Sequence, residues 1–150
     1  ALLVRDSHQD VIRRAAISYF GSVKNDKNYD RLKALASYGG TTWDARPEAV
    51  SQLSRYAKEK RETIDIFVNL LEDRSRDVRR RAIYALASHG DKTHLGPLDE
   101  VMFKDPALGR DIRYAKKRIL NPPKKPTKTP VEKKLEEANR KLDEIKRLLD

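Results

Sequence analysis

Two segments of this 150-residue chain are variants of one another, and this repetition constrains the fold more than any other feature. The first reads DSHQDVIRRAAISYFG from Asp6, and the second reads DRSRDVRRRAIYALAS from Asp73, an offset of 67 residues. A third, weaker copy lies 30 residues further on and begins near Leu108. Self-similarity at a period of about 30–47 residues, in a sequence with helical patterning, indicates a solenoid of stacked helix pairs.

Apolar residues recur at the spacing of an α-helix along the whole repeat region. The expected helices cover residues 8–23, 27–38, 62–72, 76–88 and about 106–120, with others opening near Pro47 and Pro97. In the first helix, the expected buried stripe is Val11, Ala15, Ser18 and Tyr19. The sequence predicts no strands. We therefore expect an all-α solenoid of about four helix pairs over residues 1–120, the first pair being truncated.

The last thirty residues differ from the repeats. Residues 121–130 read NPPKKPTKTP, and this proline-rich segment is expected to be an extended spacer. Residues 131–150 are expected to form an amphipathic helix, because their apolar residues follow a heptad spacing. Its candidate packing residues are Leu135, Leu142, Ile145 and Leu149. Since so short a seam does not sustain a free coiled coil, it should pack on the last repeat or on a second copy, and we favour the repeat.

The composition limits the classes of function. The net charge is +10, and residues 1–120 hold 24 basic and 17 acidic side chains, a balance of +7 that permits contact with nucleic acid or another anionic surface. No apolar run is long enough to cross a bilayer, so no membrane partner is expected. The absence of cysteine excludes disulfides and thiolate metal sites, and it fits a cytoplasmic protein without excluding export.

One repeat carries a family resemblance. The segment LLEDRSRDVRRRAIYALASHGD, from Leu70, has an apolar pair, then Asp73, then Val78 and Arg79, with an alanine three residues later. This pattern resembles the HEAT-repeat family and extends over about residues 1–120. The resemblance implies an αα superhelix in which the turn aspartate and the arginine after the valine form a ladder of side-chain contacts along the stack.

The ladder pattern is incomplete in the other repeats. The first copy keeps Asp6 but has Ile12 at the arginine position. In the last copy, Asp105 lies three residues before Leu108, where five would be expected. We therefore expect the ladder only in the third repeat.

A narrower resemblance concerns the order of segments. YDRLKALASYGG is followed by a loop with Trp43 and Arg46, a helix with Pro47 and Ala49, and then IDIFVNLLEDRSRDVRRRAIYALASHGDKTHLGPL. This order is similar to the C-terminal region of some prokaryotic zinc aminopeptidases of the aminopeptidase-N type, which is non-catalytic. The metal motif HExxH has no counterpart here, so the resemblance supplies no catalytic residue. Because Ala1–Val4 matches the last turn of a repeat helix, we expect a fragment of a longer protein.

Catalytic, metal and cofactor sites are not predicted. The three histidines are His8, His89 and His94, and the last two straddle the helix stop at Gly90. A zinc site needs three or four converging ligands, so surface or capping roles are expected instead. No nucleophile–base constellation and no phosphate-binding glycine loop is present.

Arginines at repeat positions are the candidate interaction residues. They are Arg13, Arg14, Arg79, Arg80 and Arg81. Because stacked repeats bring equivalent positions into register, these side chains can form one basic stripe, although acidic residues lie among them. Trp43 is expected to anchor its loop or to contact a partner. Tyr19, Tyr56 and Tyr84 are expected near packed faces, so few aromatic platforms for bases are predicted.

Taken together, these patterns favour a non-catalytic interaction or scaffold module. Its partner would be another protein or the remainder of its own parent chain, possible parents including an aminopeptidase-N-type metallopeptidase. The alternative is a basic helical-repeat domain that binds nucleic acid through the arginine stripe.

Overall fold

The computed structural model describes residues 10–37, 45–123 and 130–149, and all regular structure within these ranges is helical. The α-helices are α2 (Asp10–Ser22), α3 (Asp26–Ala36), α4 (Ala45–Leu53), α5 (Glu62–Leu70), α6 (Arg76–His89), α7 (Leu95–Lys104), α8 (Gly109–Leu120) and α9 (Pro130–Leu149). Short 3₁₀ turns lie at η1 (Ser54–Tyr56), η2 (Lys92–His94) and η3 (Pro106–Leu108). The all-α class predicted from the sequence is confirmed.

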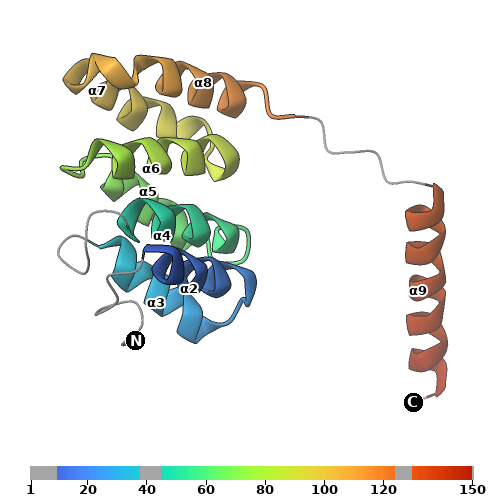
Figure 1. Cartoon of the computed structure of the whole chain (residues 1–150). Coiled ribbons are helices and arrows are strands. Elements are labelled where there is room, and N and C mark those ends of the chain that lie inside the picture. Colours follow the sequence, from blue (N-terminus) through green and yellow to red (C-terminus); the bar gives the residue numbers. More distant parts are fainter. Residues whose placement is uncertain (1–9, 38–44, 124–129, 150) are drawn as a thin grey trace.

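The helices pack in two layers (Figure 1). Consecutive helices pair as α3 with α4, α5 with α6, and α7 with α8, while α2, α4, α6 and α8 pack on one another in a row. One continuous apolar core runs between the layers, and its largest fully buried side chains include Tyr56, Phe67, Ile83 and Leu98. The row of even-numbered helices brings residues far apart in sequence side by side.

Apolar residues at helical spacing form the buried faces of α6 and α8. Leu108, Ile112 and Ala115 of the third copy are buried, as are Val78 and Ala82 in α6. Helix stops and starts also have local causes: the side chain of Asn25 caps α3, and that of Ser75 caps α6. The spacing of apolar residues and the capping residues therefore predict the approximate bounds of these helices.

The stripe predicted for α2 was wrong. Ala15, Ser18 and Tyr19 are exposed, whereas Ile17 and Phe20 are buried against the core. The burial pattern of α2 matches that of α6 at an offset of 65 residues rather than 67, because Ile17 and Phe20 stand where Ala82 and Ala85 stand in α6. The alignment by residue identity, at an offset of 67, therefore differs by two positions from the alignment by burial, at an offset of 65.

Close packing of α2 on α4 explains a glycine in α2. Gly21 is buried, and a β-carbon added there would lie 2.8 Å from the β-carbon of Gln52. Gln52 is itself held in place, because its Nε2 donates a hydrogen bond of 2.7 Å to Oε1 of Glu48. Among the described residues, the side-chain oxygen of Gln52 has no hydrogen-bond partner, so this crossing already contains one unsatisfied polar atom there.

We expect Gly21→Ala to lower the free energy of unfolding by about 1–3 kcal/mol, because the added methyl must displace Gln52. This loss exceeds the gain of up to about 1 kcal/mol that alanine brings to a helix interior. Chemical denaturation followed by circular dichroism measures it. Gly96→Ala is the matched control, since nothing lies within 4 Å of its added carbon, and it should be neutral or stabilising. Equal effects at both sites would contradict the steric explanation.

A buried ion pair and a partly buried one link successive repeats. The guanidinium of Arg46 in α4 binds both carboxylate oxygens of Asp73, which follows α5, and its Nε donates to the carbonyl of Ala36 at 3.3 Å. One repeat later, Nη2 of Arg79 donates to Oδ2 of Asp105 at 2.7 Å. Nη1 of the same arginine donates to the carbonyl oxygen of Asp73 at 2.6 Å.

These contacts correct the expectation that the ladder is confined to one repeat. Asp105 is engaged despite its unusual spacing, and Asp73 pairs with Arg46 of the preceding repeat, which sequence comparison treated only as a loop residue. The pKa of Asp105 is lowered, chiefly by its hydrogen bond with Arg79 and also by the charge of Arg76. The first ion pair joins α4 to the turn after α5, and the second joins α6 to the turn after α7.

The apolar stripe of α9 is not buried in cis. Leu135, Leu142 and Ile145 are 60%, 52% and 54% exposed, and Figure 1 draws α9 apart from the packed helices. The favoured packing of this helix on the last repeat is therefore not observed. Leu149 belongs to α9, but its side chain lies outside the described residues.

Candidate functional site

A cavity of about 310 Å³ opens where the first turns of α4 and α6 lie beside α2. Its lining residues are Arg14 from α2, Pro47 and Glu48 from α4, and Ser75, Asp77, Arg80 and Arg81 at the start of α6. We call this cavity the arginine pocket. Three of the five predicted interaction arginines meet in it, although Arg14 and Arg81 are 67 residues apart in the sequence.

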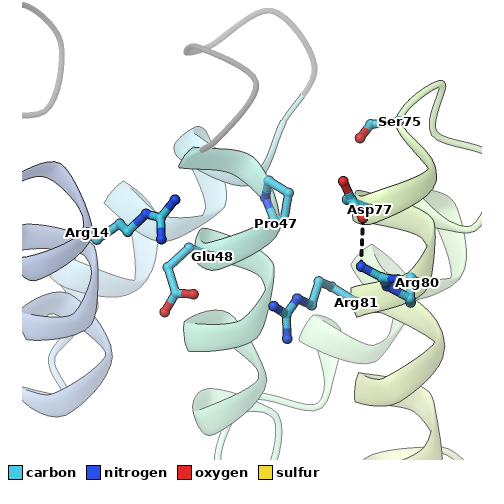
Figure 2. Close-up of a pocket in the computed structure, with 7 residues that line it drawn as sticks. All are labelled: Arg14, Pro47, Glu48, Ser75, Asp77, Arg80 and Arg81. Carbon is cyan, nitrogen blue, oxygen red and sulfur yellow. Dashed lines mark hydrogen bonds and ion pairs between the residues drawn. The ribbon is translucent and has the colours of Figure 1, made fainter. Parts of the chain in front are cut away.

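Arg14 and Arg81 reach into the arginine pocket from opposite sides. Figure 2 shows both side chains extending toward α4, with the carboxylate of Glu48 between them. Both residues are exposed, and within the described part of the chain neither forms a hydrogen bond or an ion pair. Their guanidinium groups are therefore available to a ligand that enters the pocket.

Acidic groups offset part of the positive charge of the arginine pocket. Nη2 of Arg80 donates to Oδ1 of Asp77 at 2.8 Å, and Glu48 contributes a second carboxylate. Three arginines against two carboxylates leave a formal charge of +1. The amino termini of α4 and α6 add positive potential, because the first turns of a helix present unpaired backbone N–H groups.

The other two predicted arginines do not line the pocket. Arg13 is only 6% exposed and lies within the packed structure. Arg79 is held by Asp105 and by backbone carbonyls, so it links repeats and does not face a ligand. The helical rotation of 100° per residue separates these neighbours, placing adjacent arginines on different faces.

A second polar cluster adjoins the arginine pocket on α6 and α8. The hydroxyl of Tyr84 donates to Oδ1 of Asp111 at 2.7 Å, and its ring packs at 5.8 Å from that of Tyr114. The pKa of Tyr84 is raised, chiefly by the hydrogen bond with Asp111, while the nearby charges of Arg80 and Arg110 act in the opposite direction. This cluster thus joins α6 to α8, with Arg80 and Arg110 near Tyr84.

The sequence predicted Tyr19 and Tyr84 near packed faces, so this cluster was not expected. Both are substantially exposed, as is Tyr114, whereas Tyr56 is buried and donates to the carbonyl of Phe20 at 2.7 Å. Arg80 and Tyr84 are four residues apart, so they lie on the same face of α6. This spacing was the sequence signal that could have placed Tyr84 beside the exposed arginine.

The histidines have structural roles where the structure describes them. Nδ1 of His94 accepts from the backbone N–H of Asp91 at 3.1 Å in a capping box, which confirms the capping role predicted for it. His89 ends α6, and burial lowers its pKa. His8 and Trp43 lie outside the described residues.

The described ranges contain neither a candidate metal site nor a candidate membrane-spanning helix. No cluster of three or more histidine, aspartate or glutamate side chains there has the arrangement of a metal site. None of the described helices combines the length and the apolar character that crossing a bilayer requires.

Comparison with known proteins adds no relative. No family model matches the chain, and neither a curated protein nor a solved structure matches it. The chemistry of the arginine pocket is therefore the main guide to function. Guanidinium groups offer planar, bidentate hydrogen bonding to anionic oxygens, and they neither accept nor release protons near neutral pH. The pocket is suited to binding an anion.

Proposed function

We propose that residues 1–120 form a HEAT-like helical solenoid that serves as a non-catalytic interaction module and binds an anionic partner in the arginine pocket. The observation that carries this proposal is the convergence of Arg14 and Arg81, both without a partner in the described structure, on one cavity. Other arginines of the same helices are already occupied by aspartates, as Arg79 and Arg80 are.

The row of even-numbered helices supports a binding role. The packed helices α2, α4 and α6 hold their backbones at fixed separations. The residues that line the arginine pocket lie on these helices or at the start of α6. Backbone positions fixed on packed helices need no further ordering when a partner binds. A partner that touches several helices at once is then recognised by the spacing of the arginines as well as by their charge.

The order of segments supports a protein context for this module. Its similarity to the C-terminal region of aminopeptidase-N-type enzymes leads us to propose that the module also contacts another protein or the rest of a longer parent chain, apart from the ligand of the arginine pocket. Sequencing the reading frame upstream of Ala1 tests the parentage. An HExxH motif with a downstream glutamate would support it, and an initiator methionine immediately before Ala1 would remove it.

Binding of an acidic peptide tests the pocket itself. Isotope-labelled protein titrated with a peptide of about ten glutamates should show saturable NMR shifts at the Nε–H groups of Arg14 and Arg81. The pocket variant, Arg14→Gln/Arg81→Gln, should bind the peptide about tenfold or more weakly, because two charge-assisted hydrogen-bond donors are lost.

The control variant, Lys58→Gln/Lys92→Gln, removes the same charge from exposed positions outside the pocket. It should change the affinity less than about twofold, the amount expected from screened, distant charges. Equal losses in the pocket and control variants would show that the peptide senses only net charge, and the proposed binding site would then be wrong.

A further inference from the structure

The charge of the arginine pocket discriminates among anionic ligands. Arg14 and Arg81 have no partner within the described structure, while Arg80 is engaged by Asp77 and Glu48 supplies one more negative charge. The net formal charge of +1 balances a monoanion. A phosphomonoester carries about −1.5 to −2 at neutral pH and would leave a negative pocket, whereas a phosphodiester carries one charge.

The geometry of the lining residues suits a phosphate held from two sides. Arg14 projects from α2 and Arg81 from α6, and both point toward the start of α4 between them (Figure 2). Each guanidinium can donate two parallel hydrogen bonds to non-bridging phosphate oxygens. Glu48 lies between them and limits the positive charge that they present.

Basic and hydrogen-bonding side chains continue in a row along the same layer. Beyond Arg80, which lines the arginine pocket, lie Tyr84 and Arg110, with the half-exposed ring of Tyr114 beside them. The carboxylate of Asp111 accepts the hydrogen bond of Tyr84 and offsets part of this positive charge. Four packed helices at about 8–10 Å spacing extend over about 24–30 Å, comparable with one turn of a nucleic-acid duplex at about 34 Å. Such a duplex presents monoanionic phosphates at regular intervals, a pattern that side chains on an acidic protein surface do not share.

We propose that the α2–α4–α6–α8 row binds the phosphodiester backbone of a double-stranded nucleic acid, with one phosphate held in the arginine pocket between Arg14 and Arg81. This inference rests on the proposed binding role of the pocket and specifies its ligand. The contacts are to phosphate and not to bases, so recognition is independent of base sequence. Arginines are common donors to phosphate oxygens, which suits Arg110, beside the Tyr84–Asp111 hydrogen bond, to a neighbouring phosphate.

Fluorescence anisotropy with a labelled DNA duplex of about 20 base pairs tests this inference. The unmodified chain should bind two duplexes of unrelated sequence with dissociation constants within about twofold, and the affinity should fall steeply as salt rises. The pocket variant should bind about tenfold or more weakly at low salt. Its slope of log affinity against log salt should be smaller by about 1, since the one phosphate contact in the arginine pocket is lost.

The control variant should keep the slope of the unmodified chain and change its affinity less than about twofold. No binding to duplex at low salt, or equal losses in the pocket and control variants, would overturn the inference. If the glutamate peptide binds through Arg14 and Arg81 while the duplex does not, the partner is an acidic protein, and the proposed function survives without the nucleic-acid ligand. Tighter binding of single-stranded DNA than of duplex would also contradict the inference.

Both variants should remain folded. Arg14 and Arg81 are exposed and form no described contact that holds the helices together, and Lys58 and Lys92 are exposed as well. Thermal unfolding followed by circular dichroism should therefore show the same midpoint for the unmodified chain and the two variants, which separates loss of binding from loss of structure.

Discussion

Replacing Arg46 by leucine is expected to lower the free energy of unfolding by about 3–5 kcal/mol, one of the largest effects that a single substitution should have in this chain. The side chains of Arg46 and Asp73 are 4% and 5% exposed, and the arginine binds both carboxylate oxygens. Without it, the carboxylate of Asp73 keeps the hydrogen bond from the backbone N–H of Ser75, at 2.8 Å, but has lost its counter-ion. A buried charge without its counter-ion is far from water and strongly destabilising.

Guanidinium denaturation followed at 222 nm by circular dichroism measures this loss. Lys104→Gln is the control, because it breaks an ion pair with Glu72 in which both side chains are more than half exposed, and such pairs contribute about 0–1 kcal/mol. The double variant Arg46→Leu/Asp73→Leu should recover part of the stability, since it removes both charges. If Arg46→Leu proved no worse than Lys104→Gln, the buried pair would not hold the repeats together.

Phe67→Ala is expected to lower the free energy of unfolding by about 3–5 kcal/mol, through lost apolar burial and the cavity that remains. The side chain of Phe67 lies on α5 and is fully buried in the continuous core. Phe103→Ala removes the same atoms from a side chain that is 89% exposed, and it should change the stability by less than about 0.5 kcal/mol. The same denaturation experiment measures both variants.

The contrast between these two phenylalanines tests the two-layer arrangement. In a loosely packed structure, both substitutions would have small and similar effects, because neither site would leave a defined cavity. A large loss of stability for Phe103→Ala would show that the side chain of Phe103 on α7 is buried, in contradiction to the described structure. A small loss for Phe67→Ala would contradict the continuous core between the layers.

The positions of the helices were predictable from the chain because their causes are local. Proline near the start of α4 and α7, the side-chain cap of α6 at Ser75, and the helix stop at Gly90 act within a few residues of each boundary. Apolar spacing then placed the buried face of α6 correctly, with Val78 and Ala82 in the core. These signals need no knowledge of what packs against the helix.

The register of α2 was not predictable in this way. Ala15 and Ile17 both fall on acceptable helical stripes, and the alignment with α6 favoured Ala15. The packing of α4 on α2 determines which stripe is buried. The two helices approach so closely that only a glycine fits at position 21, and in this orientation Ile17 lies in the core. Gly21 near the end of the helix could have indicated the face that approaches another helix. Its contact, however, is with Gln52, 31 positions later in the chain, and the sequence does not reveal that pairing.

The sequence by itself determined the helical class, the approximate helix boundaries and a set of arginines at repeat positions, since these follow from spacing, capping and composition. Only the tertiary structure decided which arginines are free. Arg46 and Arg79 meet carboxylates from the next repeat, Arg13 is buried, and Arg14 and Arg81 face one cavity. The physical reason is that adjacent residues on a helix point about 100° apart, so the crossing of neighbouring helices selects which side chains find a partner and which remain available to a ligand.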